Sequence, residues 1–246
     1  MEHHPNIIHL EHSWGIFLGS FTDNRPHKHY ALQLSIPLSD PVYIQAVEGT
    51  TSCTRGVFVK SHVNHRLYCQ GTHLLLLISP VSAMGHLLES RYTDPVACFD
   101  NPKVEEIQEM ALEYLSGKQT ENEFLENLIR SLNRLEYDYP YYENKADQRI
   151  IKALQYLEQN HQRVIPLKEI AGHCFLSTSR FLHLFKENTG ITYRRAQLWT
   201  RIRQSVPGLR HQNITQTAHQ HGFTDSAHYC KVFQETFGLS PKQLKK

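Results

Sequence analysis

Short runs of aliphatic, aromatic and β-branched residues follow one another through the first part of the chain. These runs cover residues 30–36, 42–47, 56–60 and 73–78, and turn-forming Pro, Ser, Asp and Gly residues separate the earlier ones. Strands of this length, with no helical pattern between them, are typical of an antiparallel sandwich or barrel. The pattern therefore predicts an antiparallel β domain at the N-terminal end.

Apolar residues then recur at helical spacing over residues 102–135, in two stretches. An Asn-Pro pair at residues 101–102 is typical of a helix start, and the first apolar stripe ends at Gly117. Thr120 and Glu123 have the spacing of a capping box at the start of the second stretch. The pattern predicts a helical hairpin whose apolar surface packs on the β domain or pairs with a second copy of the chain.

An irregular, Tyr-rich segment at residues 136–145 predicts a linker, and the helical part after it contains an internal repeat. Each copy has an aliphatic residue four positions before an Ala, then an aromatic residue four positions before a Phe, then a Gly. The Ala positions are offset by 47 residues and the Phe positions by 48, so the second copy has one extra residue between its two helices. The matching positions are Leu167, Ala171, Phe181, Phe185 and Gly190 in the first copy, and Ile214, Ala218, Tyr229, Phe233 and Gly238 in the second.

Each copy describes two short helices joined by a tight turn, which is a helix-turn-helix unit. The small Ala residues suit a close crossing of the two helices, and Ser177 and Asp225 are placed to cap the second helix of each copy. The second helix of such a unit lies in the major groove of DNA, where residues near its N-terminus meet base edges. The aromatic residues are spaced for packing and are predicted to lie in the core: Phe181, Phe185, Tyr229, Phe233 and Phe237.

Charge is divided unequally between the two halves of the chain. Residues 1–143 carry 10 Lys and Arg against 18 Asp and Glu, a net charge of −8, whereas residues 144–246 carry 16 against 6, a net charge of +10. A basic half of this kind indicates a polyanionic partner, DNA or RNA first of all, because neutralised phosphates release counterions. A merely solvated basic face would have the same composition.

The overall composition, 40% hydrophobic and 20% charged, is that of an ordinary soluble protein. The longest apolar run, at residues 74–78, is far shorter than a membrane span, and the N-terminus lacks the pattern of a secretory signal. Five scattered cysteines without a CxxC pair favour neither a structural zinc site nor a disulfide framework. We therefore expect a cytoplasmic protein without membrane contact.

The repeat resembles the C-terminal domain of AraC-type transcription regulators over residues 147–246. The matching strings are Ile170-Ala171, Leu176-Ser177-x-Ser179-Arg180-Phe181 and Leu184-Phe185-Lys186-Glu187 in the first copy, and Gly222-Phe223-x-Asp225, His228-Tyr229 and Phe237-Gly238-Leu239-Ser240-Pro241 in the second. The resemblance implies an α+β chain with two domains. Residues 1–143 would form an antiparallel cupin-like β-barrel with a helical hairpin, and residues 144–246 an all-α domain with two helix-turn-helix units.

Regulators of this family bind specific double-stranded DNA and respond to a small-molecule effector through the N-terminal domain. The resemblance therefore implies a transcription regulator and not an enzyme, with the hairpin at residues 102–135 as the candidate homodimer contact and RNA polymerase as a candidate partner. The family usually has an uninterrupted helix between the two units. Here the connecting segment at residues 201–213 is shorter and contains Pro207-Gly208, which is predicted to break the helix.

The resemblance also places residues toward DNA. The groove-facing positions are Thr178, Ser179, Arg180, Leu182, His183 and Lys186 in the first unit, and Ser226, Ala227, His228 and Lys231 in the second. Lys and Arg suit phosphates or guanine, Ser, Thr and His can bond to base edges, and Leu or Ala can contact a thymine methyl group. Four further arginines are expected at phosphates: Arg194, Arg195, Arg201 and Arg203. A solvated helix face is the alternative for each of these residues.

Ten histidines lie in residues 1–143, and several fall in the predicted β domain. A small-molecule effector pocket is expected at His27, His29, Gln33, His62 and His65, if the barrel brings them together. The spacing His27-x-His29-x3-Gln33 is similar to the first metal-binding motif of cupins, in which a Glu stands at the place of Gln33. Three imidazoles and an amide could hold a divalent metal, but the carboxylate is missing, so no metal and no cofactor is predicted.

Two other functions fit parts of the pattern. A metal-dependent cupin enzyme, an oxygenase or isomerase with a helical C-terminal extension, would hold a stoichiometric transition metal that metal analysis would detect. An RNA-binding or architectural protein would also be basic, but the sequence lacks the aromatic strand platforms of common RNA modules. The sequence also lacks GxGxxG, P-loop, GxSxG and HExxH motifs. A DNA-binding regulator is therefore the preferred interpretation.

Overall fold

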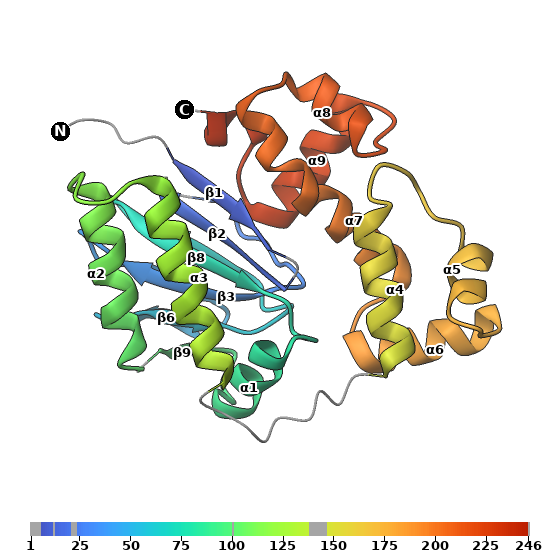
Figure 1. Ribbon diagram of the computed structural model, residues 1–246, viewed down its shortest axis with the longest axis horizontal. Helices are drawn as coiled ribbons and strands as arrows, with labels where there is room; N and C mark the ends of the chain where they lie inside the picture. Colours follow the sequence, from blue (N-terminus) through green and yellow to red (C-terminus); the bar gives the residue numbers. More distant parts are fainter. Residues whose placement is uncertain (1–5, 12, 21–23, 100, 138–146, 246) are drawn as a thin grey trace. The chain divides into compact units, whose positions relative to one another are not determined.

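A computed structural model describes residues 6–11, 13–20, 24–99, 101–137 and 147–245 (Figure 1). The chain divides into two compact units, residues 1–143 and residues 144–245. The predicted linker at residues 136–145 lies, from residue 138 onward, outside the described residues. Among the described helices, none has the length and apolar character needed to cross a membrane.

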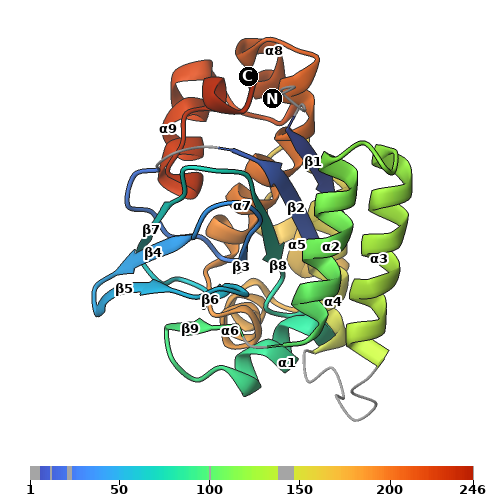
Figure 2. The ribbon, with the colours of Figure 1, turned by 90° about the vertical axis from the view of Figure 1, so that its left-hand side faces the viewer.

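The first unit is built from two antiparallel sheets and three helices. The larger sheet has the strand order β1-β2-β8-β3-β6-β9 and the smaller one β5-β4-β7. Figure 2 shows the smaller sheet on one side of the larger sheet and the helices α2 and α3 on the other. The strands are β1 (Ile7–Leu10), β2 (Trp14–Gly19), β3 (Leu32–Pro37), β4 (Tyr43–Ala46), β5 (Gly49–Ser52), β6 (Val57–Val59), β7 (His65–Tyr68), β8 (His73–Ile78) and β9 (Val96–Cys98), and the helices are α1 (Ala83–Arg91), α2 (Lys103–Leu115) and α3 (Glu121–Tyr137).

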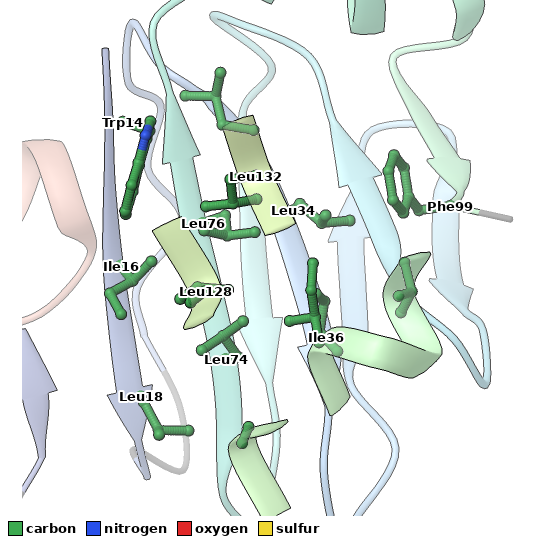
Figure 3. Close-up of a cluster of buried hydrophobic side chains, with 14 of the residues drawn as sticks. Trp14, Ile16, Leu18, Leu34, Ile36, Leu74, Leu76, Phe99, Leu128 and Leu132 are labelled. Carbon is green, nitrogen blue, oxygen red and sulfur yellow. The ribbon is translucent and has the colours of Figure 1, made fainter. Parts of the chain in front are cut away.

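The main core lies between the larger sheet and the hairpin of α2 and α3. Side chains alternate between the two faces of a strand, and Leu34 and Ile36 of β3 point into this core with Leu74 and Leu76 of β8 (Figure 3). Leu128 of α3 is fully buried in the same cluster. The apolar stripes of the hairpin thus pack on the sheet, which is one of the two arrangements that the sequence allowed.

The opposite face of β3 looks toward the smaller sheet. A second apolar cluster forms there from β4, β6 and β7, and it includes Ile44, Val57, Val59 and Leu67. Gln33, which alternates with the core-facing leucines of β3, is buried on this second face. The space between the two sheets therefore contains polar as well as apolar side chains, and this decides where the histidines of the unit lie.

The predicted caps of the helical hairpin are present. The Lys103 amide donates to Asn101 Oδ1 at 2.9 Å, which caps the start of α2. The Thr120 amide donates to Glu123 Oε2 at 2.7 Å and the Glu123 amide donates to Thr120 Oγ1 at 3.3 Å, so both bonds of the capping box form. The bonds that Glu123 Oε2 accepts from the Thr120 amide and hydroxyl lower the pKa of Glu123.

One cysteine pair differs from the expectation. The structure joins Cys53, directly after β5, to Cys98 at the end of β9 by a disulfide, with the two Cα atoms 5.7 Å apart. The two residues are 45 positions apart in sequence, so their proximity depends on the neighbouring ends of β5 and β9 and not on any local motif. A disulfide framework was not expected, and the described residues contain this one pair, whereas Cys69, Cys174 and Cys230 carry free thiols.

The second unit is helical, and its elements repeat as the sequence predicts. From α5 to α8 both helix ends move by 47 residues, and from α6 to α9 both move by 48. The connecting helix α7 ends at Ser205, and Pro207 opens a separate 3₁₀ turn, η1, so the predicted break is confirmed. The elements are α4 (Gln148–Gln159), α5 (Leu167–His173), α6 (Thr178–Thr189), α7 (Tyr193–Ser205), η1 (Pro207–Arg210), α8 (Ile214–Gln220), α9 (Ser226–Phe237) and η2 (Pro241–Lys245).

The turns of the two copies have a left-handed residue at the same place. Phe175 has φ 55° in the first turn, and Gly222, 47 residues later, has φ 71° in the second. A Cβ atom on Gly222 would lie 2.8 Å from the carbonyl oxygen of Gln162, so this turn needs glycine for both its backbone and its packing. Phe175 adopts the same left-handed backbone conformation, and 93% of the surface of this residue is exposed.

Candidate functional site

The second helix of each repeat has one buried and one exposed face. Phe181 and Phe185 of α6 are fully buried, as are the corresponding Tyr229 and Phe233 of α9, which confirms their predicted core positions. Phe237 at the end of α9 is half-buried and packs 4.7 Å from the Phe233 ring. The buried aromatic faces orient both helices so that the opposite faces meet solvent.

Both helices begin at the predicted caps. Ser177 Oγ accepts a bond from the Arg180 amide at 3.3 Å. Asp225 Oδ1 accepts a bond from the His228 amide at 2.7 Å, which lowers the pKa of this carboxyl group. The caps fix the first turn of each helix, the part that meets base edges in helix-turn-helix units.

The predicted groove-facing residues share the exposed faces of these two helices. In the first unit all six are exposed: Thr178, Ser179, Arg180, Leu182, His183 and Lys186. In the second unit Ala227, His228 and Lys231 are exposed and Ser226 is half-buried. An exposed leucine, here Leu182 at 40%, is consistent with an apolar contact that is completed by a partner.

The two faces present different chemistry at equivalent positions. With the offset of 48 residues between α6 and α9, Ala227 corresponds to Ser179, His228 to Arg180 and Lys231 to His183. The Lys231 ammonium lies 4.0 Å from Glu235 on a strongly exposed surface, with 74% of its side chain accessible. The two helices thus share one backbone geometry but do not display the same donors and acceptors.

The four arginines that were expected at phosphates fall into two groups. Arg194 and Arg195 are exposed in the first turn of α7, where the Thr192 hydroxyl accepts a bond from the Arg195 amide. Arg201 and Arg203 are buried, with 6% and 7% of their surface exposed, so the expectation of phosphate contacts is wrong for these two.

Arg201 holds the turn of the second helix-turn-helix unit. Its Nε donates to the carbonyl oxygen of His221 at 2.8 Å, its other guanidinium nitrogen donates to the carbonyl oxygen of Gly222, and its guanidinium lies 4.4 Å from the centre of the Phe223 ring. Arg203 pairs with Glu158 of α4. Sequence reasoning missed both roles because the carbonyl partners lie in the turn between α8 and α9 and the carboxylate partner lies in α4.

A histidine cluster occupies the first unit, between the two sheets. One ring nitrogen from each of His27, His29 and His65 lies within 4.8 Å of the others, and all three residues are buried. Gln33 Oε1 lies 3.0 Å from His29 Nε2 and 3.1 Å from His65 Nε2. His62, the fifth member of the predicted set, lies beside the Tyr30 ring, 6.2 Å away, and does not belong to this group.

Burial keeps the clustered imidazoles neutral. Desolvation, together with the neighbouring histidines, lowers the pKa of His27 to about 2 and that of His65 to about 3, and desolvation also lowers the pKa of His29. Neutral imidazole has one nitrogen that donates and one that accepts. The cluster therefore offers lone pairs at ordinary pH and no positive charge.

Comparison with known proteins identifies the C-terminal repeat. Residues 170–246 match a protein family described as "Helix-turn-helix domain". The chain is 30% identical over 101 residues to the regulatory protein PocR of Salmonella typhimurium, which covers 39% of this chain and 32% of PocR. It is also 30% identical over 101 residues to the transcriptional activator RhaS of Klebsiella pneumoniae, covering 40% of this chain and 36% of RhaS.

These matches support the resemblance of the C-terminal repeat to AraC-type transcription regulators. Both matched relatives are regulatory proteins. The chain spans about a third of the length of PocR and RhaS.

The whole fold is similar to that of ToxT from Vibrio cholerae. A crystal structure of apo ToxT matches with a TM-score of 0.64 at 16% identity, covering 94% of this chain and 96% of ToxT. A structure of ToxT bound to an unsaturated fatty acid matches with a TM-score of 0.60 at 15% identity, covering 97% of each chain. The predicted architecture, an antiparallel β domain with a helical hairpin followed by an all-α domain with two helix-turn-helix units, is confirmed.

Proposed function

We propose that this chain is a transcription regulator that binds specific double-stranded DNA through α6 and α9. The observation that supports this most strongly is the pair of capped helices whose exposed faces carry polar and basic side chains at matching positions. These faces belong to residues 144–246, the part of the chain with a net charge of +10. The charge favours binding to phosphates, and the helix faces supply the contacts that can distinguish bases.

In this proposal the first unit reads bases mainly through Arg180 and His183, with Lys186 one turn further on. An arginine suits the two acceptors of guanine, and a neutral histidine can donate to or accept from a base edge. Thr178, Ser179 and Leu182 complete the reading surface of this helix. Arg194 and Arg195, at the start of α7, are proposed to contact phosphates.

The second unit is proposed to read a different base sequence. Its surface consists of Ser226, Ala227, His228 and Lys231. Since Ala227, His228 and Lys231 differ from their counterparts in the first unit, one chain should recognise two unlike half-sites. Helix-turn-helix pairs address half-sites about one helical turn, roughly 34 Å, apart along the duplex.

The N-terminal unit is proposed to be the regulatory domain, and the chain is proposed to act in the cytoplasm as a homodimer. ToxT, which shares the fold, has been solved with a fatty acid bound, and a small-molecule effector is proposed for this chain as well. Residues 1–143 carry a net charge of −8, so this half can compete with DNA phosphates for the basic half. An effector that changes this competition would change DNA affinity or contact with RNA polymerase.

Selection of bound sequences from a random pool of duplex DNA tests the proposal. The full chain is expected to enrich a defined motif, and its affinity for that motif should fall with rising salt concentration. The variant carrying Arg180→Ala and His183→Ala should lose discrimination between sequences, whereas Lys186→Ala should weaken binding to all sequences about equally. Lys152→Ala, an exposed lysine of α4 outside the proposed surface, is the matched control and should bind as the parent does.

Failure to enrich any sequence would contradict the proposal. Equal discrimination by the Arg180 and His183 double variant and the parent would show that the first unit does not read bases. A stronger preference for RNA than for duplex DNA would favour the RNA-binding alternative.

A further inference from the structure

Backbone hydrogen bonds hold together the two segments that carry the clustered histidines. The His27 amide donates to the His65 carbonyl oxygen at 2.9 Å, and the His65 amide donates to the His27 carbonyl oxygen at 2.9 Å. The His62 amide donates to the His29 carbonyl oxygen at 3.0 Å. These bonds fix the segment before β3 against the segment that leads into β7, so the imidazoles are held in place by the fold.

The outward nitrogen of each ring faces a backbone carbonyl. His27 Nδ1 lies 3.0 Å from the Arg25 oxygen, His29 Nδ1 lies 2.8 Å from the Ala31 oxygen, and His65 Nδ1 lies 3.0 Å from the Val63 oxygen. A carbonyl oxygen only accepts, so each Nδ1 must carry the proton and donate it. In a neutral ring Nε2 then carries a lone pair.

The inward nitrogens of His29 and His65 meet another acceptor. Both Nε2 atoms lie about one hydrogen-bond length from Gln33 Oε1, at 3.0 Å and 3.1 Å, while Gln33 Nε2 donates to Ser35 Oγ at 3.0 Å. With the Gln33 amide oriented so that its Nε2 donates to Ser35 Oγ, no proton lies between these nitrogens and the oxygen. Lone pairs that face one another in a buried space repel each other unless a cation lies among them.

The spacing suits a small metal ion. Ligand bonds of 2.0–2.1 Å in a tetrahedral zinc site put the donor atoms roughly 3.3 Å apart, which is close to the two distances from Gln33 Oε1. The carbonyl bonds to the outer nitrogens also match a known feature of metal sites, in which the ligating histidine donates its other N–H to a carbonyl or carboxylate group. All three rings of the cluster satisfy this condition.

We propose that His27, His29, His65 and Gln33 form a binding site for one divalent first-row transition metal ion, with three imidazole nitrogens and one amide oxygen as donors. Imidazole ligands favour Zn²⁺, Ni²⁺, Co²⁺, Fe²⁺ or Cu²⁺ over Mg²⁺ and Ca²⁺. The missing carboxylate argued against a metal in the sequence, but Gln33 places an uncharged oxygen donor at the same position. The proposal stands on these contacts alone and does not depend on DNA binding.

The uncharged donor set has a consequence of its own. With no carboxylate among the four donors, a bound dication keeps its full charge inside a buried site. Gln33→Glu would place a negative charge beside it, and affinity should rise by at least about tenfold. If the four residues do not bind a metal ion, Gln33→Glu should not change the metal affinity of the protein.

Metal titration of the full chain tests the site. The protein is stripped with a chelator, titrated with Zn²⁺ or Co²⁺, and measured by elemental analysis after dialysis and by the visible absorption of Co²⁺. One ion per chain is expected. His29→Ala and His65→Ala should weaken binding by more than the roughly 10- to 100-fold that loss of an outer-shell partner costs.

His62→Asn is the matched control. It removes a nearby imidazole that lies outside the cluster, and asparagine tolerates the positive φ of 63° at this position. This variant should bind one ion as tightly as the parent. Circular dichroism of each variant shows whether it is folded, and Gln33→Glu provides a test that does not remove any histidine.

Two results would overturn the proposal. Several weakly bound ions, lost equally in His62→Asn and His65→Ala, would place the metal on other histidines. No tight ion in either the parent or Gln33→Glu would show that the Gln33 amide is turned, so that its NH₂ group donates to both Nε2 atoms and the cluster is a hydrogen-bond network.

Discussion

Replacing Arg201 by methionine separates an arginine that stabilises the fold from Arg195, which is proposed to contact DNA. Arg201→Met keeps the apolar stem of the side chain but removes the two bonds to the His221 and Gly222 carbonyl oxygens and the contact with the Phe223 ring. Arg195→Met is the matched change on the same helix, α7, at an exposed position. Arg201→Met is predicted to lower mainly the stability of the second unit, and Arg195→Met is predicted to weaken mainly DNA binding.

The magnitude follows from the contacts that are lost. A hydrogen bond from a charged donor contributes about 1.5–3 kcal/mol, and a cation over an aromatic ring contributes about 1 kcal/mol. The half-buried His221 carbonyl can recover part of its bond from water, and the methionine packs in place of the arginine stem. Arg201→Met should therefore lower the free energy of unfolding of the second unit by about 3 kcal/mol, and Arg195→Met by less than about 0.5 kcal/mol.

Urea denaturation measures this effect in the full chain. The chain has two tryptophans, Trp14 in the first unit and Trp199 in α7, so in a Trp14→Phe background the fluorescence reports the second unit. DNA titration at several salt concentrations gives the second measurement, in which Arg195→Met should reduce the salt slope by about 1. Equal stability of Arg201→Met and the parent would refute the positioning role of Arg201, and an unchanged salt slope in Arg195→Met would remove Arg195 from the DNA surface.

Three further substitutions test other parts of the fold. Gly222→Ala should lower the unfolding free energy by at least about 1 kcal/mol, because φ is 71° and the added Cβ meets the Gln162 carbonyl oxygen at 2.8 Å; a thermal melt unchanged from the parent would contradict this. Asp225 has a lowered pKa because its carboxylate accepts a bond from the His228 amide. Its stabilising effect should therefore be present above its unfolded pKa and be lost as the pH falls toward its folded pKa. In acid titrations Asp225→Asn should reduce this pH-dependent loss of stability, and an acid profile equal to that of the parent would contradict the stabilising effect of Asp225. Leu128→Ala removes a fully buried side chain between α3 and the larger sheet and should cost about 2–5 kcal/mol in urea denaturation; a loss below about 1 kcal/mol would show that the hairpin packs loosely.

The sequence predicts best the elements whose pattern is local. The strands near residues 32–37 and 73–78, the capped hairpin and the two helix-turn-helix units follow from apolar periodicity, capping residues and the repeat. The apolar strand β2 was also missed, although its local signal is strong, whereas three other missed elements carry weaker local signals. β5 consists of small polar residues at an edge, β7 has a polar composition and α1 lacks an apolar stripe, so their conformations depend on pairing and packing with other segments.

The candidate functional residues also divide into those that a local pattern predicts and those that depend on contacts with distant segments. The exposed faces of α6 and α9 could be predicted because the caps and buried aromatic residues fix the helix orientation. The burial of Arg201 and Arg203 could not be predicted, since it depends on a carbonyl group in the turn between α8 and α9 and on a carboxylate group of α4. The approach of His27, His29, Gln33 and His65 was expected from the barrel, but the direction of each ring nitrogen depends on backbone carbonyls that the sequence does not reveal.

Repeating the selection from random DNA with one helix changed at a time measures whether α6 and α9 read separate half-sites. One variant replaces Ser179, Arg180 and His183 in α6 by alanine, and the other replaces His228 and Lys231 in α9 by alanine. Each variant is predicted to lose sequence preference in one half of the enriched motif and to keep it in the other. Loss of preference in the same half by both variants, or unchanged motifs in both, would contradict recognition of DNA by these two helices.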